Sequence, residues 1–389
     1  MNTDLIKKEI PLLEIKNSSV LVRVGFDIPN LIDLNRVLSA KKTIQQLLEN
    51  GNKVVLVSKW GRIKGIPDPK FSFSSISKLI SDCLDLNEKI EFINQFETVE
   101  FNNSKESELK DLIKNAKSSL ILLENTHFEE KEISTLSCHR MEIAQIYSQI
   151  ATYFVDECFI SSHRKEASNF EIKKCLTWAF GTDYKSETSH LNVLKENPKK
   201  PFSCIMGGAK LSTKLPLIEK MLHCCDQIIL GGLLCFTFQK AVNELLESGI
   251  NLGFPFIDIK DSLLEIAFVQ SAKNILLKNS QQIILPLDYH FSSLAEKNLA
   301  LDIGPESIEL FKSVIRSSKT VFWNGPMGLA EEVQFSNGTK ELGLELASNP
   351  NIYKIAGGGD TLACLDQKTR DKFNYISMGG GATLSFLSN

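Results

Sequence analysis

The chain has 389 residues, with 44 Lys plus Arg against 47 Asp plus Glu and a formal net charge of −3. At roughly 150 residues per domain, this length predicts two or three domains, each able to bury a core. The charge balance gives no reason to expect nucleic acid or an anionic membrane as a partner. No apolar run approaches the ~20 residues of a membrane helix, and the nine cysteines include no CxxC pair. We therefore expect a cytoplasmic protein with free thiols.

Short runs of Val, Ile, Leu and Phe alternate along the chain with longer amphipathic stretches. The runs are not interrupted by polar residues, which is typical of strands covered on both faces. They predict strands at 20–26, 53–57, 120–123, 153–155, 202–206, 227–230, 282–285, 320–323, 353–356 and 375–377. The stretches between them predict helices at 37–49, 142–150, 213–225, 238–247, 263–277, 307–315, 339–347 and 361–367. This alternation predicts an α/β fold with parallel sheets.

Ten strands are too many for one comfortable sheet, so the chain is expected to divide. A polar, helix-like stretch at 185–195 leads into NPKKP at 197–201, where two prolines resist regular structure. We expect two Rossmann-like domains, at 1–183 and 201–376, joined by an interdomain helix and hinge at 184–200. A cleft is expected between the domains, and 377–389 forms a tail.

Glycines follow five predicted strands of the second half, at 207–208, 231–232, 325 and 328, 357–359 and 379–381. In an open α/β sheet, ligands bind at the carboxyl ends of the strands, beside helix N-termini. Glycine lets a phosphate approach the backbone, although a single such turn is weak evidence because tight turns also use glycine. Five of them favour a nucleotide site. Neither a P-loop motif nor a GxGxxG motif that opens a helix is present.

Charged residues near these glycines have alternative interpretations. Asp360 is either the N-cap of a helix or a ligand that holds Mg²⁺ against phosphate oxygens, and the surrounding glycines favour the metal. Thr361 is a candidate phosphate ligand. Lys210 and Lys214 lie one helical turn apart. They form either a solvated face or a pair aimed at a phosphoryl group in transfer.

The first half carries cations where its predicted strands end. Lys59 and Arg62 follow one strand, His127 follows the next, and the sequence HRK at 163–165 follows a third. Arg36 lies beyond the loop of the first strand. One such cation is usually a surface feature. Several that converge would bind a small multivalent anion, because guanidinium groups match carboxylate and phosphate.

Segments from nearly the whole chain resemble motifs of the phosphoglycerate kinase family, in the family's order. In the first half, LVRVGFDIP (21–29) resembles R-V-D-x-N-V-P, SKWGR (58–62) resembles S-H-L-G-R, LENTHF (123–128) resembles L-E-N-x-R-F, and DECF (156–159) with SHRKEAS (162–168) resembles N-D-A-F…A-H-R-A-H-A-S. In the second half, GGAKLSTK (207–214) resembles G-G-A-K-V-S-D-K. DIGP (302–305), WNGPMG (323–328), GGGDT (357–361) and GGGA (379–382) are close to unaltered. These last four, in this order, are highly specific.

The resemblance implies a glycolytic kinase that transfers a phosphoryl group reversibly between ATP and the carboxylate of 3-phosphoglycerate, with Mg²⁺ as cofactor. The products are 1,3-bisphosphoglycerate and ADP. It further implies a hinge-bending monomer whose domain at 1–183 binds the acid and whose domain at 201–376 binds the nucleotide. The tail at 377–389 is expected to return to the N-terminal domain.

The resemblance also implies roles for single residues. Lys214 stabilises the transferring phosphoryl group, Lys210 binds nucleotide phosphates, Asp360 holds Mg²⁺ and Thr361 binds a phosphate. The remaining expected nucleotide contacts are Gly207, Gly208, Gly231, Asn324, Pro326, Glu331, Gly358 and Gly359. Backbone N–H groups at Gly379, Gly380 and Gly381 are expected to face the phosphoryl group in transfer. The acid substrate is expected to contact Asp27, Arg36 (also catalytic), Lys59, Arg62, His127 and Arg164.

The acid-substrate half departs from the family motifs at five positions. Gly25 stands where the motif has Asp, Asp27 where it has Asn, Lys59 where it has His, His127 where it has Arg, and Glu166 where it has His. Three arginines and Lys59 still give four full positive charges, so an anionic substrate is expected.

Three hypotheses follow from this pattern. The first is a phosphoglycerate kinase with a rearranged acid site. The second is a kinase of another small carboxylic acid, because the changes gather on one substrate's side. The third is a nucleotide-binding protein without catalysis, against which the pair Lys210 and Lys214 argues.

Overall fold

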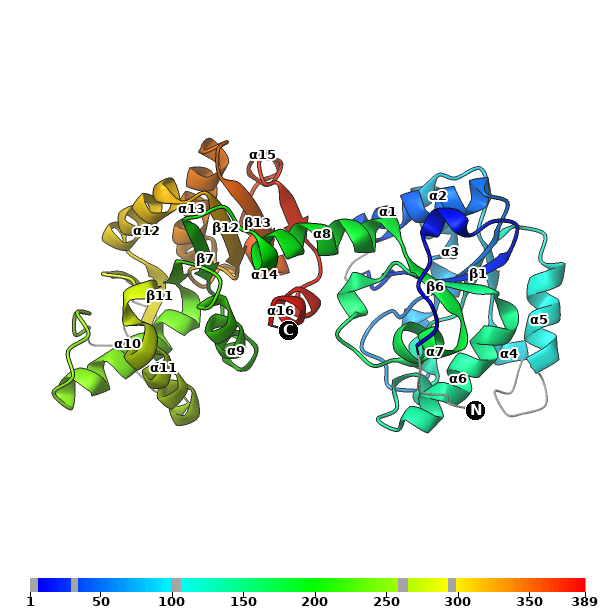
Figure 1. Cartoon of the computed structure of the whole chain (residues 1–389), viewed down its shortest axis with the longest axis horizontal. Coiled ribbons are helices and arrows are strands. Elements are labelled where there is room, and N and C mark those ends of the chain that lie inside the picture. Colours follow the sequence, from blue (N-terminus) through cyan, green and yellow to red (C-terminus); the bar gives the residue numbers. More distant parts are fainter. Residues whose placement is uncertain (1–5, 29–33, 99–105, 258–264, 293–298, 389) are drawn as a thin grey trace. The chain divides into compact units, whose positions relative to one another are not determined.

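The computed structural model describes residues 6–28, 34–98, 106–257, 265–292 and 299–388. The chain divides into two compact units, Met1–Thr188 and Ser189–Asn389. The division falls inside helix α8 (Thr182–Glu196), within the predicted connecting segment. Each unit contains one parallel six-stranded sheet (Figure 1). The predicted α/β class with two Rossmann-like sheets is therefore confirmed.

The first sheet is covered by helices on both faces, with the strand order β3-β4-β2-β1-β5-β6. Its strands are β1 (Ser19–Arg23), β2 (Lys53–Val57), β3 (Glu91–Ile93), β4 (Leu120–Leu123), β5 (Tyr153–Asp156) and β6 (Thr177–Phe180). The helices are α1 (Asn35–Ser39), α2 (Lys41–Glu49), α3 (Ser77–Leu84), α4 (Gln95–Thr98), α5 (Glu106–Asn115), α6 (Ser137–Ile150) and α7 (Ile172–Cys175). Val54 and Leu56 of β2 pack with α2 and α3, whereas Val55 and Val57 pack with α5 and α6. This two-sided burial explains why β2 is apolar throughout.

The second sheet has the order β14-β13-β12-β7-β8-β9. Its strands are β7 (Phe202–Met206), β8 (Gln227–Leu230), β9 (Ile283–Ile284), β12 (Thr320–Asn324), β13 (Tyr353–Gly357) and β14 (Tyr375–Ser377), beside an antiparallel hairpin of β10 (Tyr289–Ser292) and β11 (Leu299–Ile303). The helices are α9 (Leu211–Met221), α10 (Gly232–Glu247), α11 (Ile266–Asn279), α12 (Pro305–Ser317), α13 (Asn337–Ser348), α14 (Gly359–Ala363), α15 (Gln367–Arg370) and α16 (Gly381–Ser388). Ile205, Ile229 and Trp323 pack on one face against Phe311 and Leu342 of α12 and α13.

Both sheets reverse their strand order at one place. In the first sheet β1 lies between β2 and β5, and in the second β7 lies between β8 and β12. At such a switch point the connections leave in opposite directions and open a crevice at the carboxyl ends of the strands, where ligands bind. The segments that follow Arg23 and Met206 are therefore the places to look for ligand-binding groups.

One predicted helix is wrong. The stretch 361–367 is not one continuous helix, because α14 ends at Ala363 and α15 begins only at Gln367. The carboxylate of Asp366 accepts a hydrogen bond from the backbone N–H of Thr369 at 2.8 Å. This N-cap starts a new helix where the apolar pattern suggested continuation.

Other differences are smaller. The predicted helix at 37–49 is two helices, α1 and α2, which meet at Ala40. Strands β3, β6, β10 and β11 are not predicted, and part of the predicted helix at 263–277 lies outside the described residues. The return of the tail 377–389 to the N-terminal domain stays a prediction, and its helix α16 packs on α9.

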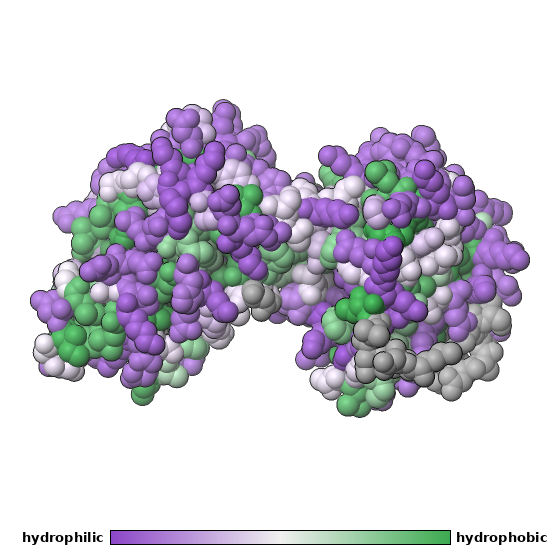
Figure 2. Space-filling view, in the orientation of Figure 1, coloured by the Kyte–Doolittle hydropathy of each residue, from purple (hydrophilic) through white to green (hydrophobic). Residues whose placement is uncertain are grey.

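The surface is mainly hydrophilic on the face that Figure 2 shows, with scattered hydrophobic residues. Among the helices that the structure describes, none has the length and apolar character needed to cross a lipid bilayer.

The core of the first unit can be tested at Phe154 of β5, which is fully buried. Phe154→Ala leaves a cavity and should lower the free energy of unfolding by about 3–5 kcal/mol. Urea titration measures this change. Leu13→Ala is the control, because Leu13 is 67% exposed, and it should cost no more than about 0.5 kcal/mol. Equal losses in the two variants would contradict the assigned core.

Candidate functional sites

The turns after β7 and β12 are bonded to each other at the switch point of the second sheet. The backbone N–H of Gly207 donates to the carbonyl of Asn324 at 3.0 Å, and that of Gly208 donates to the carbonyl of Pro326 at 2.8 Å. These bonds extend the parallel pairing of the strands beyond their ends. They hold the two glycine-rich turns together as one rigid surface.

Some of the predicted glycines are required by close packing. A Cβ atom at Gly207 would overlap the carbonyl oxygen of Pro326, and one at Gly231 would overlap the side chain of Met327. Gly325 has a φ of +101°, which disfavours any L side chain. These positions therefore need glycine to bring neighbouring turns together.

Other glycines border open space. A Cβ atom at Gly359 or Gly380 would meet nothing within 4 Å among the described atoms. Gly358 precedes α14 as its N-cap, and Gly381 is the first residue of α16. An approach to the backbone is left open at these helix starts, as anion binding requires.

The side chain of Lys214 is bonded to both of these segments. Its ammonium Nζ donates to the carbonyl of Asn324 at 3.0 Å, to the side-chain Oδ1 of Asn324 at 2.9 Å, and to the carbonyl of Gly207. Burial lowers the pKa of Lys214 to about 8, against the opposing effect of the Asp360 carboxylate. A partly desolvated cation is thus fixed beside the glycine turns.

The other predicted charged residues of this half lie at the surface. Asp360 is exposed in the first turn of α14, where Gly358 and not Asp360 occupies the N-cap. The interpretation of Asp360 as an N-cap is therefore wrong. Lys210 and Glu331 are exposed as well, so of the two lysines only Lys214 is buried.

The donor set around Asp360 fits a magnesium ion that is shared with a nucleotide. No cluster of three or more His, Cys, Asp or Glu side chains that could hold a metal occurs within the described ranges. Mg²⁺ needs only one or two carboxylates when phosphate oxygens and water complete its shell. Asp360 offers one exposed carboxylate, and Thr361, whose Oγ1 accepts a bond from the N–H of Gly325 at 2.8 Å, follows it.

In the first unit, Asp27 joins two of the predicted cations beyond β1. Its carboxylate pairs closely with the ammonium of Lys59 and lies 4.0 Å from the guanidinium of Arg36. Burial raises the pKa of Asp27, but the charge and hydrogen bond of Lys59, the N–H of Gly61 and the Arg36 charge together outweigh it, and the net shift is downward. Asp27 therefore stays ionised at neutral pH.

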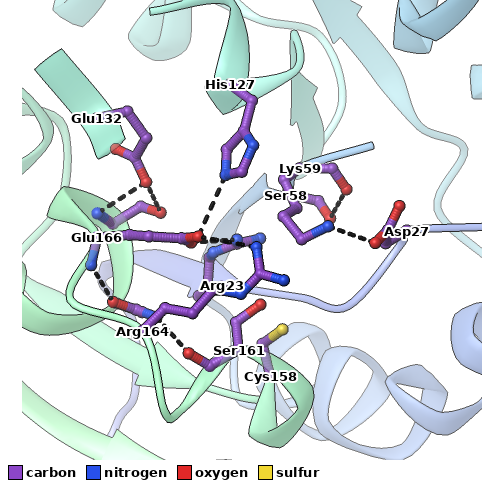
Figure 3. A network of polar contacts seen from close by, with 12 residues as sticks. Arg23, Asp27, Ser58, Lys59, His127, Glu132, Cys158, Ser161, Arg164 and Glu166 are labelled. Carbon is purple, nitrogen blue, oxygen red and sulfur yellow. Dashed lines mark hydrogen bonds and ion pairs between the residues drawn. The ribbon is translucent and has the colours of Figure 1, made fainter. Parts of the chain in front are cut away.

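Glu166 joins two more of the predicted cations, His127 and Arg164, to Arg23 (Figure 3). Its Oε2 lies 3.1 Å from Arg23, and its Oε1 lies 3.2 Å from His127 Nε2 and 3.6 Å from Arg164. Burial raises the pKa of Glu166, but the bond from His127 and the Arg23 charge lower it to about 2. The Arg164 and Arg23 charges in turn help to lower the pKa of Lys59, which is already lowered by burial, so the two groups of residues lie close together.

The structure thus brings together five of the six predicted acid-substrate residues. Arg62 is exposed and has no hydrogen bond or ion pair with any described residue. Arg23 is not among the predicted site residues, although an arginine inside an apolar strand signals a buried partner. Glu132 is also missed. Burial and the neighbouring Glu166 raise its pKa to about 8, and the sequence carries no signal for it.

The fold and these groups define a two-unit α/β protein with a candidate anion site at the switch point of each sheet. A family model described as phosphoglycerate kinase matches residues 10–389. The phosphoglycerate kinase of Finegoldia magna is 33% identical over 403 residues, which cover 98% of this chain and 96% of that protein. The phosphoglycerate kinase of Coprothermobacter proteolyticus is 33% identical over 388 residues, with coverage of 96% and 94%.

Solved structures agree with these relatives. A phosphoglycerate kinase structure from Coxiella burnetii has a TM-score of 0.77 to this chain at 28% identity, and the match covers 96% of this chain and 94% of that one. The chain belongs to the phosphoglycerate kinase family.

The two kinds of glycine predict different responses to alanine. Gly207→Ala should lower the midpoint of thermal unfolding by several degrees, because its Cβ has no room beside Pro326. Gly359→Ala should leave the midpoint nearly unchanged, because open space surrounds it. Thermal unfolding followed by circular dichroism measures both. Equal midpoints would show that Gly207 is not packed as described.

Proposed function

We propose that this chain catalyses the reaction for which its family is named, the reversible transfer of a phosphoryl group between ATP and the carboxylate of 3-phosphoglycerate. The observation that carries the proposal is the buried ammonium of Lys214, fixed by Asn324 and Gly207 beside the glycine turns. A protein that only binds nucleotides has no evident need for this cation.

The chemistry asks little of the protein beyond position and charge. A carboxylate oxygen of the acid attacks the terminal phosphorus of ATP, the new O–P bond forms, and the bridging bond breaks with its electron pair passing to ADP. No general base is needed, because the carboxylate is already a nucleophile. Two anions must be held in line, and the charge of a loose transition state must be offset. Lys214 and the N–H groups at Gly380 and Gly381 are suited to that task.

Residues of the first unit would bind the acid. Arg164 is about half exposed and Arg36 about a quarter exposed, so both can reach a ligand. Arg62, which follows β2 in the chain, is exposed as well. Guanidinium groups form paired bonds with carboxylates and phosphates. A substrate that carries both groups suits such a set.

Magnesium would be held by Asp360 together with nucleotide phosphates. When bound, it would neutralise phosphate charge. The residues Lys210, Thr361 and Glu331 are proposed to contact the nucleotide, with Gly207, Gly208, Gly231, Asn324, Pro326, Gly358 and Gly359.

The role of Lys214 is tested with ATP, Mg²⁺ and 3-phosphoglycerate in a coupled assay of ADP release. Lys214→Ala should lower kcat by at least about 10²–10³-fold, because a preorganised cation is lost from the transition state, while ADP binding is retained. Lys220→Ala is the control, since Lys220 is exposed on the same helix. Unchanged kcat in Lys214→Ala would refute the role. If the unaltered protein shows no turnover, assays with other small carboxylic acids decide between the second and third hypotheses.

The metal proposal predicts that EDTA abolishes turnover and that Asp360→Asn raises the Mg²⁺ concentration for half-maximal rate about tenfold or more. A magnesium titration at fixed ATP measures this. Asp371→Asn is the matched control, because Asp371 is an exposed carboxylate of the same region. A shift of the same size in both variants would contradict the assignment.

A further inference from the structure

Two of the ion pairs in the first unit are formed by residues that depart from the family motifs. Lys59 and Asp27 pair with each other, and both replace other residue types. His127 and Glu166 pair at 3.2 Å, and both are replacements too. Each new carboxylate therefore faces a new partner. The replacements at 27 and 59 cancel in charge, whereas those at 127 and 166 both make the site less positive.

Glu166 does more than pair with His127. The residues that the structure describes offer no other side-chain partner to the guanidinium of Arg23, which is fully buried. The ring of His127 likewise has only Glu166, and its Nδ1 has no partner. A single carboxylate thus anchors two buried side chains at the end of the strand.

Arg164 is held differently. Its side chain is 46% exposed, and its contact to Glu166 at 3.6 Å is its only ion pair with a described residue. The guanidinium keeps most of its five N–H donors free for an anion. Lys59 and His127, in contrast, are buried and already paired.

We propose that Glu166 is a positioning residue for the acid substrate: its carboxylate fixes His127 and Arg164 beside Arg23 and directs Arg164 to an anionic group of 3-phosphoglycerate. In this arrangement Lys59 and His127 are paired within the protein and support the site, and Arg164 contacts the substrate anion. The inference rests on the proposed function, because it names the acid that the site binds.

Electrostatics supports a fixed rather than a switching role. Burial raises the pKa of Glu166, but all contacts with His127 and Arg23 together outweigh it and hold the pKa at about 2. The carboxylate therefore keeps its charge at every pH used in an assay. Only substitution removes it.

The test compares Glu166→Gln with the unaltered protein, using the KM for 3-phosphoglycerate, the KM for ATP and kcat. Glu166→Gln removes the charge that orients Arg164, and a misplaced binding group can cost up to about 10²-fold, so the KM for 3-phosphoglycerate should rise roughly 10–100-fold. The KM for ATP should stay within about twofold. Glu130→Gln is the matched control, because Glu130 is an exposed carboxylate of the same unit, and it should change neither constant.

Asp and Gln variants separate positioning from folding. Glu166→Asp keeps the charge and should recover most of the affinity for the acid. His127→Gln removes the partner of Glu166 and should also raise the KM for 3-phosphoglycerate. In the double variant this KM should rise by less than the product of the two single effects, because both substitutions break the same contact. If Glu166→Gln fails to fold, Glu166→Asp and His127→Gln carry the test.

Three results would overturn the inference. They are an unchanged or lower KM for 3-phosphoglycerate in Glu166→Gln, an equal rise in both KM values, and a His127→Gln variant with unaltered KM. Calorimetric measurement of 3-phosphoglycerate binding distinguishes a failure of this inference from a failure of the proposed function. If the unaltered protein binds the acid without turnover, only the proposed kinase activity is refuted. The Kd values of the variants for 3-phosphoglycerate then test the role of Glu166. If the unaltered protein neither binds the acid nor turns it over, the proposed function and the role of Glu166 are both refuted.

Discussion

A charge that leaves water must find a partner, and this requirement shapes both candidate sites. An unpaired buried ion costs several kcal/mol, so a folded chain keeps one only with an opposite charge or several hydrogen bonds around it. Lys214 meets the requirement with oxygens of Gly207 and Asn324. Arg23 meets it with Glu166. The partners fix where each cation lies, so the geometry exists before any ligand arrives.

Topology explains why these charges gather where they do. Each sheet is buried on both faces, which leaves only its edges and strand ends for polar groups. At the switch points β1 and β7 are flanked by connections that run in opposite directions, and the ends of these strands stay accessible. The same apolar runs that form the cores therefore place the ionic groups at the ends of the sheets.

The sequence predicts the strands well, because the two-sided burial of parallel strands makes continuous apolar runs such as β2, β4 and β7. It also predicts the glycine turns and the residues that carry the resemblance. It does not predict the short edge strand β3, or the break at Asp366, which depends on one side-chain bond. The pairing of Glu166 with Arg23 is equally hidden. These residues stand 143 positions apart in the chain, and no local pattern joins them.

The burial of Lys214 has a consequence for the free protein. Because the pKa of Lys214 is about 8, its amine is protonated in about half of the molecules when the pH of the solution is also about 8. The terminal phosphoryl group of ATP, which Lys214 is proposed to contact and which ADP lacks, would stabilise the protonated form, so that ATP binding takes up a proton from solution. The heat of ATP association then contains a contribution from the buffer, and the apparent affinity weakens as the medium becomes alkaline.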